Sequence, residues 1–303
     1  MQFWVGVTDR DWYDFLAVGK PEEVNFWQPS ERVLARFLAP GVPFLFKLHS
    51  PDNFIVGGGF FVRVTSLPVY MAWSAFGRNN GVVDIAEFVR RLARYRRDAN
   101  THSVIACNIL AEPFFLPRSE WIPIPADWKP NVVRGKTYDT EAETGRDLWS
   151  AVLLRLSKTT GEVGLGIKEA PRFGAEYLAR ARLGQGAFRI LVADAYTRRC
   201  AITGERTLPA LEAAHIKSYS EGGPHATSNG LFLRSDIHKL FDENYVTVTT
   251  DLRIEVSRKI AEEFENGKEY YRYHGKPLQV VPNNSMDRPS NEYLRWHNSH
   301  FLA

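Results

Sequence analysis

The most regular hydrophobic pattern of the chain lies in its C-terminal third. Apolar positions there first alternate with polar ones, as in half-buried strands, and then move to helical spacing at Ile237, Leu240 and Phe241. Ser235 or Asp236 is placed to cap the start of this helix. The pattern predicts two strands, a polar Gly-Gly-Pro loop between them and a short helix behind them, namely strands 211–217 and 229–234, loop 218–228 and helix 235–244.

Further elements are predicted on both sides of this unit. Apolar positions at helical spacing, among them Phe188, Val192 and Tyr196, predict a helix that leads into the first strand. Beyond the unit, the pattern predicts a hairpin and a closing helix, at residues 245–249 with 253–257 and at residues 291–301.

The N-terminal part of the chain has a different texture, rich in aromatic side chains and interrupted by glycines. Its apolar alternation predicts three strands and a capped helical turn, at residues 3–8, 42–48 and 53–64 and at residues 9–16. A small mixed barrel fits this order of elements best. The texture changes after about residue 128, so the chain is expected to hold more than one domain.

Three side chains of the strand, strand, helix unit are of the types that a small nuclease site needs: His215, Asn229 and His238. Phosphodiester hydrolysis requires an activated water, an electrophile for the phosphate oxygens and stabilisation of the departing oxygen. A neutral imidazole is a suitable general base near neutral pH, and an amide oxygen and a second imidazole can ligate a divalent cation. Either histidine alone is more often structural, and it is the ordered set that predicts phosphodiester hydrolysis.

Four short elements of this unit resemble the HNH endonuclease family, whose members are also called ββα-metal nucleases. The elements are Ala-His-Ile at 214–216, Gly-Gly at 222–223, Asn-Gly-Leu at 229–231 and His-Lys-Leu-Phe-Asp at 238–242. The resemblance implies that His215 is the general base, Asn229 a metal-site residue and His238 a metal ligand. It also implies a divalent cation, Mg²⁺ or Mn²⁺ or else Co²⁺ or Ni²⁺.

One position departs from the family pattern. Ala214 stands where many members carry a metal ligand, and Glu212, two residues earlier on the same strand face, is the candidate replacement. His225 lies in the loop and is expected to be a bystander. The chain has only two cysteines, Cys107 and Cys200, which fall in different predicted domains, so no structural zinc is expected.

The opening Phe-Trp-Val-Gly-Val-Thr segment, the Pro-Gly-Val-Pro-Phe-Leu-Phe-Lys strand and the glycine-rich strand after it resemble the PUA-like superfamily, especially EVE domains, over about residues 1–125. The resemblance implies a pocket for a modified base that is turned out of the stack. Such a pocket needs flat side chains and a few polar groups for the base edge. Two segments that read as loops supply candidates, although any single tryptophan is more often part of a core: Asn25, Phe26 and Trp27, and Trp73, Ser74 and Phe76.

Basic residues give weaker information. The net charge is only +3, but a predicted helix over residues 84–97 gathers Arg90, Arg91 and Arg94, together with Arg97, on one side. Arg189 has a similar place on the helix that leads into the first strand. These cations suit a DNA backbone, and they are equally common on solvated helix faces.

Together these features predict an α+β protein with two functional domains. A PUA-like mixed β-barrel reader at residues 1–130 is joined through a connector with a short helix, residues 131–174, to an HNH endonuclease domain at residues 175–303. No apolar run approaches the ~20 residues of a membrane span, and no secretory signal begins the chain. The protein is therefore expected to be cytoplasmic, and a homodimer is possible.

The expected function is that of a restriction endonuclease. It would recognise modified cytosine, methylated or hydroxymethylated, in double-stranded DNA by base flipping and would cut with the help of a metal ion. Two alternatives remain. One is an HNH nuclease of a mobile element or toxin system whose N-terminal domain reads a sequence or a partner. The other is a DNA-binding protein that no longer cuts, which only Ala214 suggests.

Overall fold

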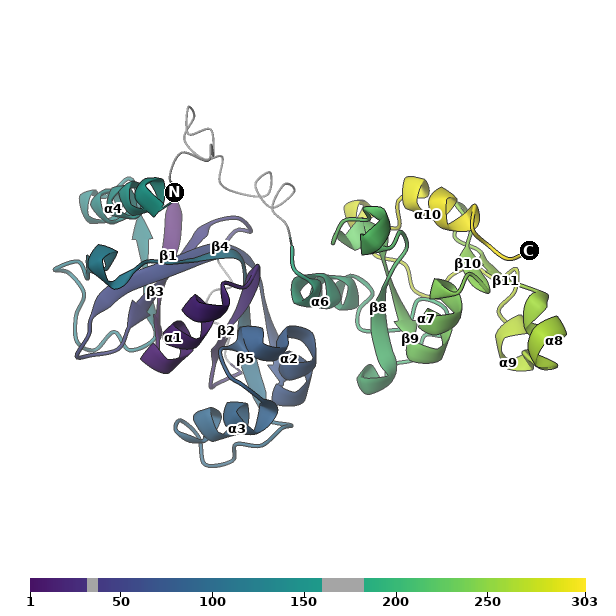
Figure 1. The fold of residues 1–303 in the computed structure, drawn as a ribbon, viewed down its shortest axis with the longest axis horizontal. Coiled ribbons are helices and arrows are strands. Elements are labelled where there is room, and N and C mark those ends of the chain that lie inside the picture. The colour runs from purple at the N-terminus through teal and green to yellow at the C-terminus, as the bar shows by residue number, and fades with distance from the viewer. Residues whose placement is uncertain (32–37, 160–182) are drawn as a thin grey trace. The chain divides into compact units, whose positions relative to one another are not determined.

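The computed structural model of the chain describes residues 1–31, 38–159 and 183–303. The chain divides into two compact units, Met1–Leu183 and Gly184–Ala303 (Figure 1). None of the helices in the described ranges combines the length and the apolar character that crossing a membrane takes.

The N-terminal unit is built on a mixed sheet of seven strands in the order β2-β5-β4-β3-β1-β7, with β6 paired to β4 (Figure 1). β1 and β3 are parallel, and the other pairs are antiparallel. No strand pair among the described residues closes the sheet into a barrel, but the mixed α+β architecture confirms the predicted class. The strands are β1 Gln2–Thr8, β2 Glu23–Gln28, β3 Pro43–Leu48, β4 Phe54–Pro68, β5 Val104–Phe115, β6 Ile122–Pro123 and β7 Gly135–Asp139.

Successive residues of a strand point to opposite sides, so both faces of this sheet carry apolar side chains. Helices cover both faces. On one side Trp4 packs in a cluster with Trp12 of α1. On the other side Phe3 and Val5 pack in a cluster with Trp149 of α4. The α-helices that the structure describes in this unit are α1 Arg10–Gly19, α2 Val69–Phe76, α3 Ile85–Ala93 and α4 Glu143–Thr159.

The predicted end of the N-terminal domain at residue 130 differs from the structure. β7 pairs with β1, and Tyr138 on β7 stacks on Phe3 at a centroid distance of 5.9 Å. Leu148, Trp149 and Val152 of α4 are buried in the same cluster. The first part of the predicted connector therefore completes the N-terminal core, and residues 160–174 of it lie outside the described residues.

The C-terminal unit contains the predicted strand, strand and helix. β8 and β9 pair antiparallel, with Leu211 opposite Arg234 and His215 opposite Gly230, and α7 follows β9 directly. The predicted hairpin, leading helix and closing helix are also present. The elements are α6 Gln185–Ala195, β8 Leu211–His215, β9 Gly230–Arg234, α7 Ser235–Asp242, β10 Val246–Val248, β11 Ile254–Val256, α8 Lys259–Phe264, α9 Lys268–Tyr271 and α10 Asn291–Asn298.

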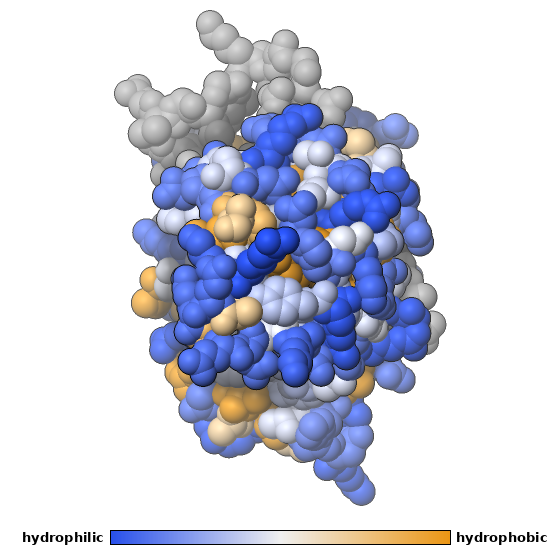
Figure 2. Space-filling view, turned by 90° about the vertical axis from the view of Figure 1, so that its right-hand side faces the viewer, coloured by the Kyte–Doolittle hydropathy of each residue, from blue (hydrophilic) through white to orange (hydrophobic). Residues whose placement is uncertain are grey.

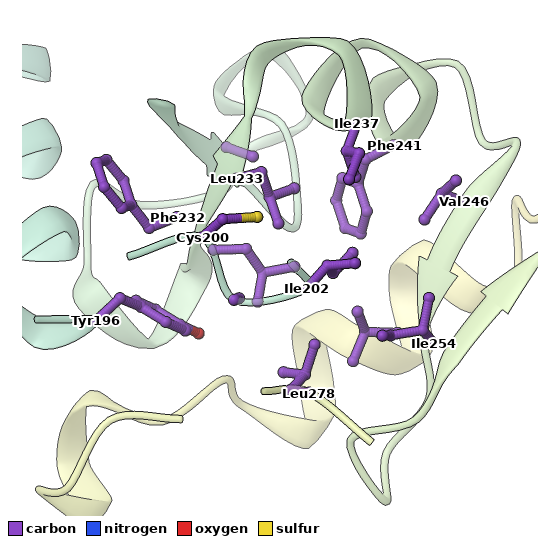
Figure 3. Close-up of a cluster of buried hydrophobic side chains, with 14 of the residues drawn as sticks. Tyr196, Cys200, Ile202, Phe232, Leu233, Ile237, Phe241, Val246, Ile254 and Leu278 are labelled. Atoms are coloured by element: carbon purple, nitrogen blue, oxygen red, sulfur yellow. The ribbon is translucent and has the colours of Figure 1, made fainter. Parts of the chain in front are cut away.

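The core of this unit is formed by apolar side chains from both strand pairs, β8–β9 and β10–β11, and from helices α6 and α7 (Figure 3). Phe241 and Ile237 on α7 are at most 1% exposed, and they point toward Leu233 of β9 and Val246 of β10. Each such side chain contributes about 1.5–3 kcal/mol when it is buried. On the face of the molecule that Figure 2 shows, hydrophobic side chains form only small separate groups among hydrophilic ones.

Two details of the chain around α7 follow from local contacts. The prediction that Ser235 or Asp236 caps α7 is wrong, since Arg234 is the cap residue and no side chain caps the helix. Asp236 instead accepts two hydrogen bonds from the Arg234 guanidinium, at 2.6 and 2.7 Å. Gly230 is required for close packing, because a Cβ there would lie 2.4 Å from Cγ2 of Val192 on α6.

A buried histidine ties α10 to α7 and β10. His297 is 3% exposed, and its ring nitrogens lie 2.7 Å from Oγ1 of Thr247 and 3.0 Å from the carbonyl oxygen of Phe241. Burial lowers the pKa of His297 from 6.5 to about 4. The neutral ring is therefore the form that the folded unit holds.

We expect this histidine to make the C-terminal unit sensitive to acid. The unfolded chain takes up the proton as the pH falls below 6.5, and the folded chain does so only near pH 4, so stability is complete above this window and is lost within it. By about pH 5 the loss from this group is on the order of 2 kcal/mol. Urea unfolding of the wild type and His297→Gln at several pH values measures it. An equally steep loss in both proteins would contradict the assignment.

Candidate active site

His215 lies at the end of β8, where the strand meets the loop to β9. Its imidazole stacks on Phe188 of α6, with centroids 3.9 Å apart and planes 12° apart. Burial, to a larger extent than electrostatic interactions with His225 and His238, lowers its pKa from 6.5 to about 4. The ring is therefore neutral at physiological pH, which is the state that a general base needs.

His225, which was not among the predicted site residues, is a direct partner of His215. Nε2 of His215 lies 2.9 Å from Nδ1 of His225, within hydrogen-bond distance. The His225 ring in turn stacks on the exposed ring of Tyr219, with centroids 4.5 Å and planes 12° apart. The prediction that His225 is a bystander does not describe this contact. Its position directly after Gly222-Gly223-Pro224, where the chain can turn back, is the signal that was available.

Asn229 holds the loop that carries His225. Its Nδ2 donates hydrogen bonds to the carbonyl oxygens of Lys217 and Pro224, at 2.9 and 3.0 Å, and its Oδ1 accepts one from the Lys217 amide, at 2.8 Å. The side chain is fully buried. The structure thus gives Asn229 a positioning part in the site, while its part at a metal ion stays a prediction.

The same loop leaves no room for a side chain at Gly223. A Cβ there would lie 1.9 Å from the carbonyl oxygen of Lys217 and 2.8 Å from Nδ2 of Asn229. The Gly-Gly pair and Asn229 therefore act together: the glycine lets the loop fold back, and the amide fastens it.

His238 on α7 lies between two carboxylates. Its Nδ1 is 2.7 Å from Oε2 of Glu212 on β8, and its Nε2 is 3.3 Å from Oδ2 of Asp242, one helical turn farther on. The contact brings together two residues that the sequence assigns to the metal site, Glu212 and His238, while their part at a metal ion stays a prediction. Asp242 was missed, although the spacing of four residues on a predicted helix was visible. Burial raises the pKa of Asp242, the charge of His238 opposes this rise, and Glu243 and Glu212 add to it.

No group of three or more histidine, cysteine, aspartate or glutamate side chains in the described part of the chain is arranged to hold a metal ion. The donor set at His238 nevertheless suits a divalent cation, because an imidazole and carboxylates are the ligands that such cations take from proteins. Histidines that bind metals commonly donate their second ring hydrogen to a carboxylate, and Asp242 stands at that place. Glu212 and His238 are therefore the pair that fits a cation.

A second candidate site lies in the N-terminal unit, where a pocket of about 830 Å³ opens beside β2. The aromatic side chains Trp12, Phe26 and Trp27 contribute to its lining. Polar side chains complete it, among them Thr8, Asp9, Gln28, Asn100 and Ser103. This volume and this mixture of aromatic and polar groups are typical of pockets for small molecules.

Hydrogen bonds fix the polar side of this pocket. Oδ2 of Asp9 accepts a hydrogen bond from the Tyr95 hydroxyl at 2.7 Å, and burial, strengthened by the Asp9 charge, raises the pKa of Tyr95. Arg96 donates to the carbonyl oxygens of Pro29 and Val104, at 3.3 and 3.0 Å. The pocket is thus lined by side chains that the fold already holds in place.

The six predicted base-binding residues divide into two groups. Asn25, Phe26 and Trp27 lie on β2 and not in a loop, and two of them, Phe26 and Trp27, line the pocket. Asn25 is fully buried and donates to Oδ1 of Asn80 at 2.9 Å. The others lie on α2 and are not part of the lining: Trp73, Ser74 and Phe76. The aromatic and polar composition of both segments suggested loops, but it does not distinguish a loop from a buried strand or helix.

The predicted arginine stripe on α3 is largely paired. Arg90 and Arg91 both bind Glu87, at 2.8 and 2.9 Å, and Arg94 lies 3.5 Å from Asp11. Arg91 is only 8% exposed. The interpretation as a stripe of outward cations is therefore wrong for Arg91, because it did not count the carboxylate one helical turn away. Arg189 on α6 is half-buried.

The ββα unit, with one histidine at the end of its first strand and another on its helix, has the arrangement that is typical of ββα nuclease domains. Residues 200–249, which contain both histidines and Asn229, match the model of a family described as HNH endonuclease. This part of the chain is an HNH endonuclease domain, as the resemblance implied. No curated relative matches the chain in sequence.

Solved structures provide two further similarities. ASCH from Zymomonas mobilis matches with 12% identity and a TM-score of 0.35, over 49% of this chain and 94% of that chain. A structure described as modification dependent TagI restriction endonuclease matches with 14% identity and a TM-score of 0.30, over 98% of this chain and 81% of that chain.

Proposed function

We propose that the protein is a modification-dependent DNA endonuclease. Its HNH domain would hydrolyse phosphodiester bonds, and the pocket beside β2 would hold a modified cytosine turned out of the double helix. The observation that carries the hydrolytic half is a neutral, stacked His215 in the same ββα unit as the Glu212 and His238 pair. The observation that carries the reading half is the aromatic pocket in the other unit.

The residues of the HNH domain divide the chemistry between them. His215 takes a proton from the attacking water, and it remains able to do so in mild acid because its pKa is about 4. The stack on Phe188 holds the ring in one orientation, so little freedom is lost when the substrate binds. Asn229 keeps the loop beside this ring in place.

Glu212 and His238 would hold a divalent cation, Mg²⁺ or Mn²⁺ or else Co²⁺ or Ni²⁺, with Asp242 orienting the His238 ring. Such an ion, when bound, supplies a Lewis acid for the charge that develops on the phosphate and the leaving oxygen. Glu212 then takes the part that Ala214 cannot take.

A flipped base gains affinity from stacking, and the structure favours Trp27 as the stacking residue. Trp27 is half-buried on the pocket wall, and its Nε1 donates to the carbonyl oxygen of Asn80 at 3.0 Å, which fixes the indole. Phe26 lies deeper in the same wall, at 3% exposure. A cytosine ring that enters the pocket would meet the indole first, and the polar lining would meet its edge.

The test of the reading half compares Trp27→Ala with Trp73→Ala in the full chain, both in a His215→Ala background that prevents cutting. Trp27→Ala should lower the affinity for DNA with 5-methylcytosine or 5-hydroxymethylcytosine by about 5- to 150-fold, the loss of one stacking contact. Trp73→Ala, a matched change outside the pocket, should leave it unchanged. Affinity is measured by fluorescence anisotropy beside the melting temperature of each variant.

The result for the parent chain decides the rest of the proposal. Matched DNA with no modification, 5-methylcytosine, 5-hydroxymethylcytosine or N6-methyladenine should be cut and bound unequally, with modified cytosine preferred. Equal binding of modified and plain DNA by a well-folded chain would refute the reading half and leave the nuclease half standing.

A further inference from the structure

The contact between His215 and His225 restricts how His215 can work. The two facing nitrogens, Nε2 of His215 and Nδ1 of His225, are 2.9 Å apart, so one ring donates a hydrogen and the other accepts it. If His225 donates, the lone pair on Nε2 is occupied. If His215 donates, Nε2 carries the hydrogen. In the first case the neutral His215 ring carries its hydrogen on Nδ1 and has no free lone pair for a water proton. Only in the second case does Nδ1 hold a free lone pair, so only then can His215 act as the base.

We propose that His225 is the positioning residue of the general base: its Nδ1 accepts the Nε2 hydrogen of His215 and so keeps the lone pair of His215 on Nδ1. The inference rests on the proposed role of His215 as general base. The tautomer of a histidine is set by the hydrogen bond that its other ring nitrogen makes. For His215 this bond is made with His225, a residue outside the set of His215, Asn229 and His238.

The surroundings of the pair support this direction of the hydrogen bond. Nδ1 of His215 has no hydrogen-bond partner among residues 1–31, 38–159 and 183–303, so none of these residues occupies its lone pair. Phe188 stacks on the His215 ring, and Tyr219 stacks on the His225 ring, each with planes 12° apart. Because a face of each histidine ring is stacked on an aromatic ring, neither histidine can turn away without losing that stack.

The loop shows the same arrangement from the backbone side. The Asn229 side chain accepts a hydrogen bond from the Lys217 amide and donates to the carbonyl oxygens of Lys217 and Pro224. Pro224 directly precedes His225 in the chain. Gly223 allows the close approach to Lys217 that this bond requires. The positioning part of Asn229 therefore reaches the general base through His225.

In the hydrolytic step the proton and the electrons balance as follows. An O–H bond of the attacking water breaks, and its proton goes to Nδ1 of His215, so this ring carries both hydrogens and a positive charge. The water oxygen bonds to phosphorus while the bond to the leaving oxygen breaks, and the leaving oxygen takes a proton from solvent. His225 continues to accept the Nε2 hydrogen, so the His215 ring keeps its orientation throughout the step.

A direct test reads the tautomer in the full-length protein. Long-range proton–nitrogen NMR correlations of a chain labelled with ¹⁵N-histidine distinguish a ring protonated at Nε2 from one protonated at Nδ1. The signals of His215 are identified by their absence in His215→Gln. We expect a neutral His215 with its hydrogen on Nε2 at neutral pH. A hydrogen on Nδ1 would overturn the proposal, and this measurement needs no variant of His225.

A kinetic test separates hydrogen bonding from packing. His225→Phe keeps a ring against Tyr219 and removes the acceptor, whereas His225→Asn places an amide oxygen near the position of Nδ1. We expect His225→Phe to lower kcat by about 10- to 100-fold with KM nearly unchanged, as for other partners that orient functional histidines, and His225→Asn to retain activity within about 5-fold. Melting temperatures show that both variants fold.

The outcomes are distinguishable from a failure of the proposed function. Wild-type activity in His225→Phe, or equal losses in two well-folded variants, would overturn the role of His225 while the nuclease remains. A wild-type chain that cuts no DNA would overturn the proposed function itself, whatever the tautomer of His215.

Discussion

Replacement of His215 by alanine is expected to lower the rate of DNA cleavage by about 10²- to 10⁴-fold, the usual contribution of a general base. The variant lacks the neutral imidazole that stacks on Phe188, so no base remains at this place to take the proton of the attacking water. DNA binding should persist, because the pocket that we assign to base recognition lies in the other unit. The measurement is single-turnover cleavage of a modified duplex, with binding followed on the same variant.

The control for this change is His300→Ala, an exposed histidine of the same unit whose ring centroid lies 4.5 Å from that of Trp296 on α10. It removes an imidazole without touching the hairpin, so cleavage should stay at the wild-type rate. Full activity in His215→Ala would remove the general base from its assigned place. Loss of activity together with a lowered melting temperature would instead mark His215 as a structural residue.

The pattern of apolar residues was sufficient to place the nuclease unit. β8, β9 and α7 fall where the change from alternation to helical spacing predicts them, because each element buries one periodic face in the core. The pairing of Glu212 with His238 was also predictable, since both stand on those periodic elements. The local pattern therefore predicted which strand or helix carries each of these site residues.

The loop contacts were less accessible to this reasoning. His225 lies in a segment without periodicity, and its distance from His215 is set by the turn at Gly223 and the amide of Asn229. Neither residue type announces such a role, because glycine and asparagine occur in most loops. A side chain that comes from an aperiodic loop can be placed only when the hydrogen bonds of that loop are known.

The N-terminal unit shows a related limit. Trp27 and Trp73 stand in similar mixtures of aromatic and polar residues, and the sequence treated them alike. The structure separates them, because β2 borders the pocket and α2 does not contribute to its lining. Likewise, β7 belongs to this unit because it pairs with β1, and α4 because it packs in the cluster of Phe3 and Val5; composition near residue 130 does not reveal either contact.

Removal of divalent cations is expected to stop cleavage by the wild type, and Glu212→Gln should raise the metal concentration needed for the half-maximal rate by about 10-fold or more. The amide keeps the size of the side chain and lowers its charge and its strength as a ligand, so folding should be unaffected. His238→Ala should lose most activity at ordinary metal concentrations and regain part of it in excess metal, because Glu212 remains on β8.

The matched control is Glu262→Gln, an exposed glutamate on α8 that should show the wild-type metal dependence. Cleavage at full rate in EDTA would refute a metal mechanism altogether. An unchanged half-maximal concentration in Glu212→Gln, with cleavage still abolished by EDTA, would have a narrower meaning. In that case Glu212 only orients His238 through its 2.7 Å contact with Nδ1, and the cation is held by His238 together with Asn229, phosphate and water.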